Sequence, residues 1–214
     1  MPTPMPQQSP INLTDPVHAD FGRDKLQIHW KKSASGLVKK DEHGVTVTFA
    51  ADERQYVVLD QKRFHLVQFH FHHPSEHWVD GRQQTMELHV VHQNADDGSR
   101  AVVGVFIEAT DKGAVVPALV PQLKAILGGS GDDTDPTVAH NPLEFLPENT
   151  DEYYRYEGSL TTPEFDENVS WAVLRQPKLL PKAELVDLIK LFKHPARLPQ
   201  GLNRRFLLAN FRTK

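Results

Sequence analysis

The sequence predicts a single β-rich domain that spans residues 1–214, with more strands than helices. Stretches of alternating polar and apolar residues, or of β-branched residues, recur along the chain and indicate strands. The chain has 214 residues, of which 39% are hydrophobic, so it can bury one sizeable core. Residues 1–7 precede the first motif and are expected to be flexible.

Local patterns place the elements in chain order. Alternation or β-branched content predicts strands at residues 45–49, 56–59, 65–73, 84–93, 101–108 and 169–174. One helix is expected at residues 118–127, ended by two glycines, and a second at residues 181–192, begun by Pro181 and carrying an apolar stripe at helical spacing. The segment 129–149 is rich in Gly, Asp and Pro and is expected to be a loop.

Two of these strands place histidines in phase. Successive side chains of a strand point to opposite faces, so His70 and His72 share one face while Phe69 and Phe71 share the other. If strands 65–73 and 84–93 pair antiparallel, His89 joins the same face. Three imidazoles then converge from rigid backbone on one point.

Such a convergence predicts an open metal site. Zinc held by three neutral histidine nitrogens, with the fourth position left to water, is typical of catalysis, whereas structural zinc closes all four positions, usually with Cys. This chain contains no Cys. Gln68 and Glu87 each lie two residues from one of the histidines and on its face, where they can accept a hydrogen bond from its second ring nitrogen and aim the ring.

A simpler interpretation of these histidines is that they only pack or face solvent. That is the more common role of a histidine in a strand, and this chain contains 12 of them. Strand parity separates the candidates. His65 and His73 are out of phase with His70 and His72, and His92 is out of phase with His89, so these three are expected to face away from the metal.

Four motifs occur in an order that is typical of one enzyme family. They are Gln68-Phe-His-Phe-His-His-Pro-Ser-Glu-His77, Glu87-Leu-His-Val-Val-His92, Gly158-Ser-Leu-Thr-Thr-Pro163 and Val169-Ser-Trp-Ala-Val-Leu174. With them the chain resembles the alpha-class carbonic anhydrases, from Gln8 almost to its C-terminus. The resemblance implies a central twisted, mostly antiparallel sheet of about ten strands with short peripheral helices.

The resemblance also implies a cofactor and a reaction. It assigns His70, His72 and His89 as ligands of Zn²⁺, with Gln68 and Glu87 as their hydrogen-bond partners. The implied activity is that of a lyase, the reversible hydration of carbon dioxide to bicarbonate and a proton through attack by zinc-bound hydroxide. A weak esterase activity is expected beside it.

Further catalytic positions follow from the same resemblance. Thr161 would accept a hydrogen bond from the hydroxide, provided that its own proton is donated to the carboxylate of Glu76. Thr162 belongs to the same motif and is a catalytic candidate with it. Taken alone, the Thr-Thr-Pro run is an ordinary turn and Glu76 an ordinary loop acid. His43 matches the proton shuttle of the family, with a merely solvated histidine as the alternative.

A small apolar substrate calls for an apolar wall beside the metal. Val91 lies two residues beyond His89 on the same strand face, so strand parity alone already places it beside the metal. Taken by composition, such residues are core packing. The resemblance adds the remaining positions of the substrate pocket, which are Val102, Leu160, Val169 and Trp171.

Two departures separate this chain from many members of the family. The usual segment rich in Trp, Tyr and Gly ahead of the Gln-Ser-Pro motif is missing. Glu164 and Phe165 stand where many members have a Cys that forms a disulfide. Both changes leave the metal ligands untouched and bear on stability and proton transfer.

Composition limits the partners. The net charge of −4 with mixed signs predicts no nucleic-acid partner, and no apolar run approaches the ~18 residues that cross a bilayer. The expected ligands are CO2 and bicarbonate, and the expected assembly is a monomer or a homodimer. As written, the N-terminus lacks a signal peptide, so we expect a cytoplasmic protein, or a periplasmic or secreted one if a leader was removed.

Two alternatives remain open at this stage. The run from His70 to Glu76 also fits the first metal motif of the cupins, in which the Glu is a ligand of iron or manganese, but the second cupin motif is not found. A binding module that kept the fold and lost the activity is the other alternative. The presence of all three histidines, Glu76 and Thr161 argues against it.

Overall fold

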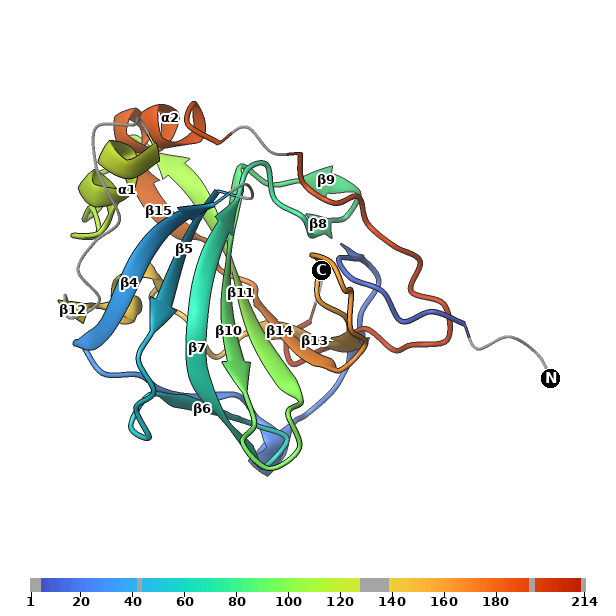
Figure 1. Cartoon of the computed structure of the whole chain (residues 1–214). Helices are drawn as coiled ribbons and strands as arrows, with labels where there is room; N and C mark the ends of the chain where they lie inside the picture. Colours follow the sequence, from blue (N-terminus) through green and yellow to red (C-terminus); the bar gives the residue numbers. More distant parts are fainter. Residues whose placement is uncertain (1–4, 42–43, 128–138, 193–194, 213–214) are drawn as a thin grey trace.

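The computed structural model describes residues 5–41, 44–127, 139–192 and 195–212. A twisted 13-stranded sheet dominates it, with the order β4-β5-β7-β10-β11-β14-β13 at its centre (Figure 1). The strands are β1 Asn12–Leu13, β2 Val17–His18, β3 Gln27–His29, β4 Ala34–Asp41, β5 Gly44–Phe49, β6 Tyr56–Leu59, β7 Lys62–His72, β8 Trp78–Val79, β9 Arg82–Gln83, β10 Met86–Gln93, β11 Arg100–Thr110, β12 Ala139–His140, β13 Tyr153–Gly158, β14 Val169–Leu174, β15 Lys178–Pro181 and β16 Leu208–Ala209.

The sheet is mostly antiparallel. Its parallel pairs are β11 with β14, β11 with β15, and β16 with β2. A mainly β fold around a twisted, mostly antiparallel sheet is therefore confirmed. Strands β4 and β13 were not predicted, although the three tyrosines of β13 are a composition typical of strands.

The register of β7 against β10 decides what can meet at the centre of the sheet. The two strands pair antiparallel, with His89 opposite His70 and Glu87 opposite His72. The register shifts between Val91 and His92, so one extra residue of β7 is left unopposed. As a result Val67 and Gln68 are consecutive in sequence yet line the same cavity.

Alternation along the central strands creates two apolar clusters, one on each face of the sheet. On one face Val90 and Val103 pack with the helices in the larger cluster. On the other face Val91 and Val102 join Trp171 in a smaller cluster. The paired histidines lie on the face of the smaller cluster, away from the helices.

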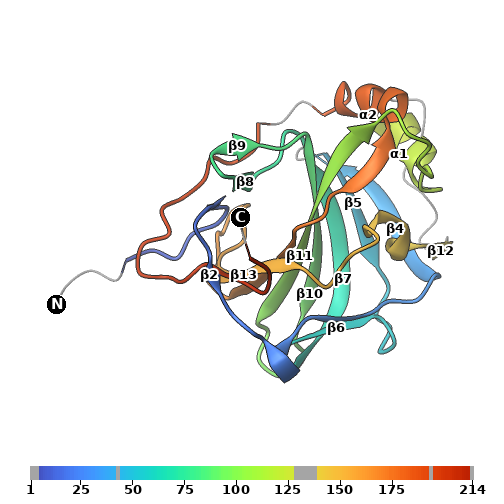
Figure 2. The ribbon, with the colours of Figure 1, turned by 180° about the vertical axis from the view of Figure 1, so that it is seen from behind.

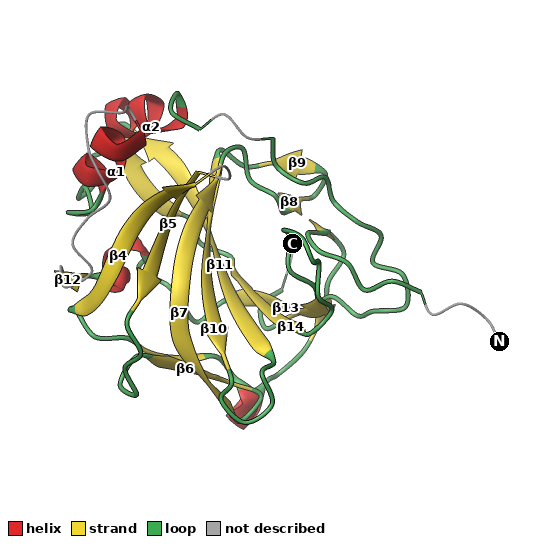
Figure 3. Cartoon of the chain, in the orientation of Figure 1, coloured by secondary structure: helices red, strands yellow, loops and turns green. Residues whose placement is uncertain are grey.

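The helices cover only one end of the sheet, where α1 (Val120–Leu127) and α2 (Lys182–Ile189) lie against each other (Figures 2 and 3). Both were predicted, with ends that differ by at most three residues. Leu185 and Leu188 of α2 are buried in the larger cluster, as their spacing indicates. Neither helix of the described part is long and apolar enough to span a membrane.

The expected loop at residues 129–149 is wrong in part. Residues 139–140 form β12, and Pro142–Phe145 form a short 3-10 helix, η2, whose first turn is capped by the side chain of Asn141. Phe145 is buried in the larger apolar cluster, which gives this segment an anchor that composition alone does not reveal. Residues 128–138 lie outside the described residues.

Gly158 ends β13 at a point where the N-terminal segment approaches closely. A Cβ atom there would lie 2.1 Å from Ser9 Oγ and 2.8 Å from a ring carbon of Tyr156. We expect Gly158→Ala to lower the free energy of unfolding by about 1–3 kcal/mol through overpacking, measured by denaturant unfolding. Gly113→Ala is the matched control, since a Cβ there meets nothing within 4 Å. An equal loss in both variants would contradict the steric explanation.

Candidate metal centre and active site

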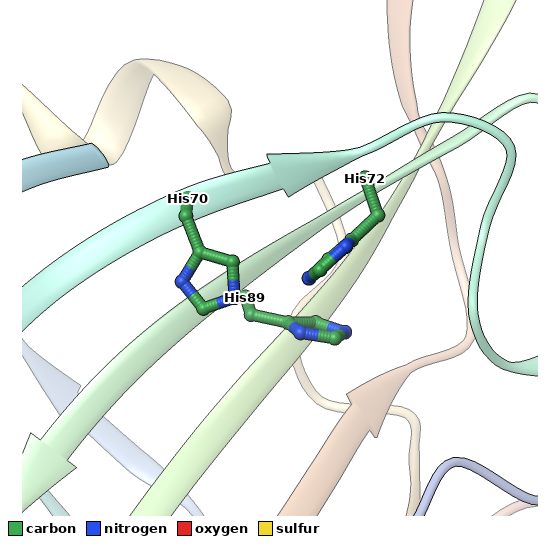
Figure 4. A group of neighbouring side chains, drawn as sticks. All are labelled: His70, His72 and His89. Carbon is green, nitrogen blue, oxygen red and sulfur yellow. The ribbon is translucent and has the colours of Figure 1, made fainter. Parts of the chain in front are cut away.

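His70, His72 and His89 converge on one point. Each offers a ring nitrogen, and these atoms lie within 4.8 Å of one another. Ring centroids are 4.8 Å apart for His70 and His72, 5.3 Å for His70 and His89, and 4.6 Å for His72 and His89. Figure 4 shows the rings of β7 and β10 turned toward a common centre. The structure therefore brings together the three histidines that strand parity predicted.

Hydrogen bonds determine which nitrogen two of these rings present to that centre. Nδ1 of His70 lies 2.9 Å from Gln68 Oε1, and Nε2 of His89 lies 3.0 Å from Glu87 Oε1. An amide oxygen and a carboxylate only accept, so the facing ring nitrogens must carry the protons. His70 then keeps the lone pair of Nε2 and His89 that of Nδ1, as a metal ligand requires.

His92, which is out of phase with His89 on β10, faces away from the metal centre, as predicted. His92 is buried on the other face of the sheet, where its ring stacks on Trp30 and its Nε2 accepts a hydrogen bond from Trp30 Nε1 at 3.0 Å. Burial lowers the pKa of His92 to about 3, so this ring stays neutral. It is a packed core residue.

Glu87 is the centre of a buried hydrogen-bond network. Its Oε2 accepts from the backbone N–H groups of Glu76 (3.0 Å) and His77 (2.8 Å), and its Oε1 lies 2.7 Å from His77 Nδ1. Burial raises the pKa of Glu87, but the charges and hydrogen bonds of His77 and His89 outweigh it and hold the pKa well below its usual value. Glu87 is therefore an ionised acceptor.

The network continues away from the metal centre. Nε2 of His77 lies 2.7 Å from the hydroxyl of Tyr156, which in turn donates to Ser9 Oγ at 2.9 Å. His77, Glu87 and His89 also lie close enough to suggest a second metal cluster. The hydrogen bonds that Glu87 makes to both rings already account for that proximity.

Glu87→Gln tests this network. An amide presents one accepting oxygen in place of two, so at least one buried donor loses its partner and the ring of His89 is no longer held by a carboxylate. We expect zinc affinity to fall by about 10–100-fold, measured by competition with a chromogenic chelator. Glu108→Gln, at a partly exposed carboxylate on β11, is the control and should leave zinc affinity unchanged. Unchanged affinity in Glu87→Gln would remove this residue from the metal centre.

Glu76 and Thr161 form a second polar unit beside the histidines. The Thr161 hydroxyl lies near enough to the Glu76 carboxylate to lower its pKa, and Oε1 of that carboxylate accepts from the backbone N–H of Arg197 at 3.0 Å. The carboxylate Oε2 lies 3.4 Å from His72 Nε2. Burial raises the pKa of Glu76, and a protonated His89 together with the hydrogen bond from Arg197 would only partly oppose this rise.

A cavity of about 240 Å³ leads to the histidines. Its lining includes the predicted apolar residues Val91, Val102, Leu160 and Trp171, together with Gln68, Thr161 and Thr162. Val169 does not reach this lining and is fully buried in the smaller apolar cluster. The proposed shuttle His43 lies outside the described residues.

The model of the eukaryotic-type carbonic anhydrase family matches residues 4–213. The chain belongs to this family. Membership in the carbonic anhydrases overturns the cupin alternative. A carbonic anhydrase of Nostoc sp. (strain PCC 7120 / SAG 25.82 / UTEX 2576) is 34% identical, over 94% of this chain and 75% of its own length.

Solved structures of carbonic anhydrases share the fold. The alpha-carbonic anhydrase of Thermovibrio ammonificans, in complex with the inhibitor sulfanilamide, is 34% identical with a TM-score of 0.78, covering 94% of this chain and 86% of that one. A hyperthermostable carbonic anhydrase identified from a hydrothermal vent chimney is 31% identical with a TM-score of 0.81, covering 95% and 87%.

Several residues of this carbonic anhydrase site were not predicted from the sequence. Ser9 belongs to the Gln-Ser-Pro motif that begins at Gln8, and His77 ends the motif that begins at Gln68. These motifs could have identified both residues as candidates. Tyr156 and the backbone of Arg197 carry no such signal, because their roles arise only from contacts between distant segments.

Proposed function

We propose that this carbonic anhydrase depends on zinc and hydrates CO2 reversibly to bicarbonate and a proton. The observation that carries the proposal is the convergence of His70, His72 and His89, with Gln68 and Glu87 behind two of them. A site built of three imidazoles, with no fourth protein ligand among the described residues, matches catalytic zinc.

The surroundings of the three histidines fit a cation. Burial lowers the pKa of His89, but Glu87 and Glu76 outweigh this effect and raise it, so the site favours positive charge. Zinc bound here would supply a water molecule whose pKa is lowered to about 7, which is the value known for zinc-bound water in carbonic anhydrase. Beside a divalent cation, Glu76 is expected to be ionised in spite of its burial.

Thr161 gives the reaction its direction. Its hydroxyl lies beside the carboxylate of Glu76, which can only accept; with its proton donated there, its oxygen is left to accept a hydrogen bond from a donor in the cavity. Thr162 lines the same cavity next to it. A donor held in this way has a defined orientation toward the apolar wall of Val91 and Trp171, where neutral CO2 would lie.

The experiment that tests the function is stopped-flow CO2 hydration by the zinc-loaded protein. We expect catalysis well above the buffer rate, together with weak hydrolysis of an activated ester. An inactive binding module is the second candidate, and it would bind zinc while leaving both rates at the level of buffer alone.

His43→Ala tests the proposed proton shuttle. If His43 carries the proton to solvent, turnover should slow by about 10-fold or more in weak buffer and recover when imidazole is added, because a mobile base replaces the missing one. His18→Ala, at an exposed histidine of β2, serves as control. No change in either buffer condition would exclude His43 from proton transfer.

A further inference from the structure

Arg100 lies at the outer end of the cavity wall. Arg100 and Val102 alternate along β11, and Gln93 and Val91 alternate along the neighbouring β10, with Gln93 opposite Arg100. All four line the cavity. Within the described lining, Arg100 is the only side chain with a permanent charge.

The register places Arg100 between the metal centre and the β10–β11 hairpin. Gly104 is opposite His89, and Arg100 lies four residues along the same strand. At about 3.3 Å per residue this is about 13 Å between Cα positions, before the length of the arginine side chain is considered. A charge at this distance lies within the range of electrostatic interactions at low salt, where the screening length is about 30 Å at 0.01 M.

Among the described residues, a single nitrogen of the Arg100 guanidinium makes all of its hydrogen bonds to the protein. Nη1 donates to Asp166 Oδ2 at 3.2 Å and to Asn168 Oδ1 at 3.0 Å. Within the described part of the chain, no hydrogen bond uses Nη2 or Nε, and the side chain is 26% exposed. A guanidinium has five donors, so most of its capacity remains for solvent or a ligand. Asp166 is about half exposed and offsets part of the charge.

We propose that Arg100 attracts small monovalent anions, bicarbonate among them, into the cavity. The inference rests on the proposed function for the identity of its physiological anion. The protein as a whole carries a net charge of −4, which repels anions, and the cationic side chain of Arg100 in a largely apolar cavity counteracts this locally. CO2 is neutral and is not affected. Arg100 therefore sets the affinity of the cavity for the anionic species, whereas the affinity for CO2 does not depend on it.

Two variants at one ion pair separate this role from a structural one. Arg100→Gln removes the cation, and Asp166→Asn removes its counter-charge, yet both break the same ion pair. If the pair only stabilises the fold, both variants should change anion affinity in the same direction or leave it alone. If Arg100 attracts anions, the two variants should change it in opposite directions.

The experiment is calorimetric titration of the zinc-loaded protein with sodium thiocyanate at low ionic strength, alongside the KM for bicarbonate dehydration. We expect the dissociation constant and the KM to rise about threefold in Arg100→Gln, to fall in Asp166→Asn, and to stay near wild type in Arg100→Lys. The kcat/KM for CO2 hydration should change by less than about twofold. Opposite shifts of thiocyanate affinity in a protein without CO2 hydration would support the anion site and overturn the proposed function. Equal or unchanged thiocyanate affinities in the two variants would overturn the anion site.

Discussion

His89→Ala is expected to strip zinc from the protein and to abolish CO2 hydration. His89 is fully buried and supplies one of the three converging nitrogens, so no neighbouring side chain or bulk solvent can easily take its place. Loss of an outer partner of a metal ligand typically costs about 10–100-fold in affinity, and loss of the ligand itself should cost more. Zinc content by atomic emission and stopped-flow hydration measure the two effects.

His65→Ala is the matched control for this prediction. His65 lies on β7 as well, five residues from His70. The bulge at Val67 puts it opposite Gln93, on the face of His89 and not on the far face that strict parity predicts, and its side chain is 24% exposed beside Glu53. Zinc content and rate should stay at the wild-type level. Full activity in His89→Ala, or an equal loss in His65→Ala, would refute the assignment of the ligands by strand parity.

Thr161→Val is expected to keep zinc and to lose most of the rate. Valine has nearly the shape of threonine but no hydroxyl, so the buried Glu76 loses a donor and the cavity loses its oriented acceptor. We expect kcat/KM to fall by about 10²-fold, the order of magnitude that misplacement of a reacting group costs. Zinc content should remain equal to that of the wild type.

Thr161→Ser separates the hydroxyl from the rest of the side chain. Serine retains the donor and the acceptor, so the rate should stay within about tenfold of wild type. If Thr161→Val keeps the wild-type rate, or if serine is as poor as valine, the hydroxyl does not orient the reaction.

The sequence predicted the centre of the fold better than its edges. In β7 and β10 the alternation is local and long, so the face of each side chain can be read without knowing the neighbours. Antiparallel pairing then needs only a connection of suitable length. Short strands such as β2, β8 and β16 contain two residues each and carry no period to detect.

The bulge in β7 shows what alternation cannot reveal. Strict parity puts Val67 on the face opposite Gln68, whereas the shifted register lets both line the cavity. Such a shift depends on the pairing of two strands, which is not encoded in either one alone. The same parity nevertheless predicted His70, His72 and His89, because these residues lie beyond the bulge.

The hydrogen-bond network behind Glu87 could not be predicted from the sequence, because it joins residues that are far apart along the chain. His77 and Tyr156 are 79 residues apart, and Tyr156 and Ser9 are 147 residues apart. Contacts of this kind follow from the topology of the sheet, in which β13 lies two strands from β11 and is followed by β16 and by β2 from the N-terminal part of the chain. The sequence gives the positions of Tyr156 and Ser9, but it does not reveal that their hydroxyl groups extend the buried hydrogen-bond network of His77 and Glu87.

Anomalous X-ray diffraction at the zinc edge, on crystals of the zinc-loaded protein, tests the central claim most directly. The account predicts one zinc ion at about 2.0–2.1 Å from a ring nitrogen of His70, His72 and His89, with no fourth protein ligand. A zinc ion bound elsewhere, or one whose fourth position is closed by a protein side chain, would contradict it.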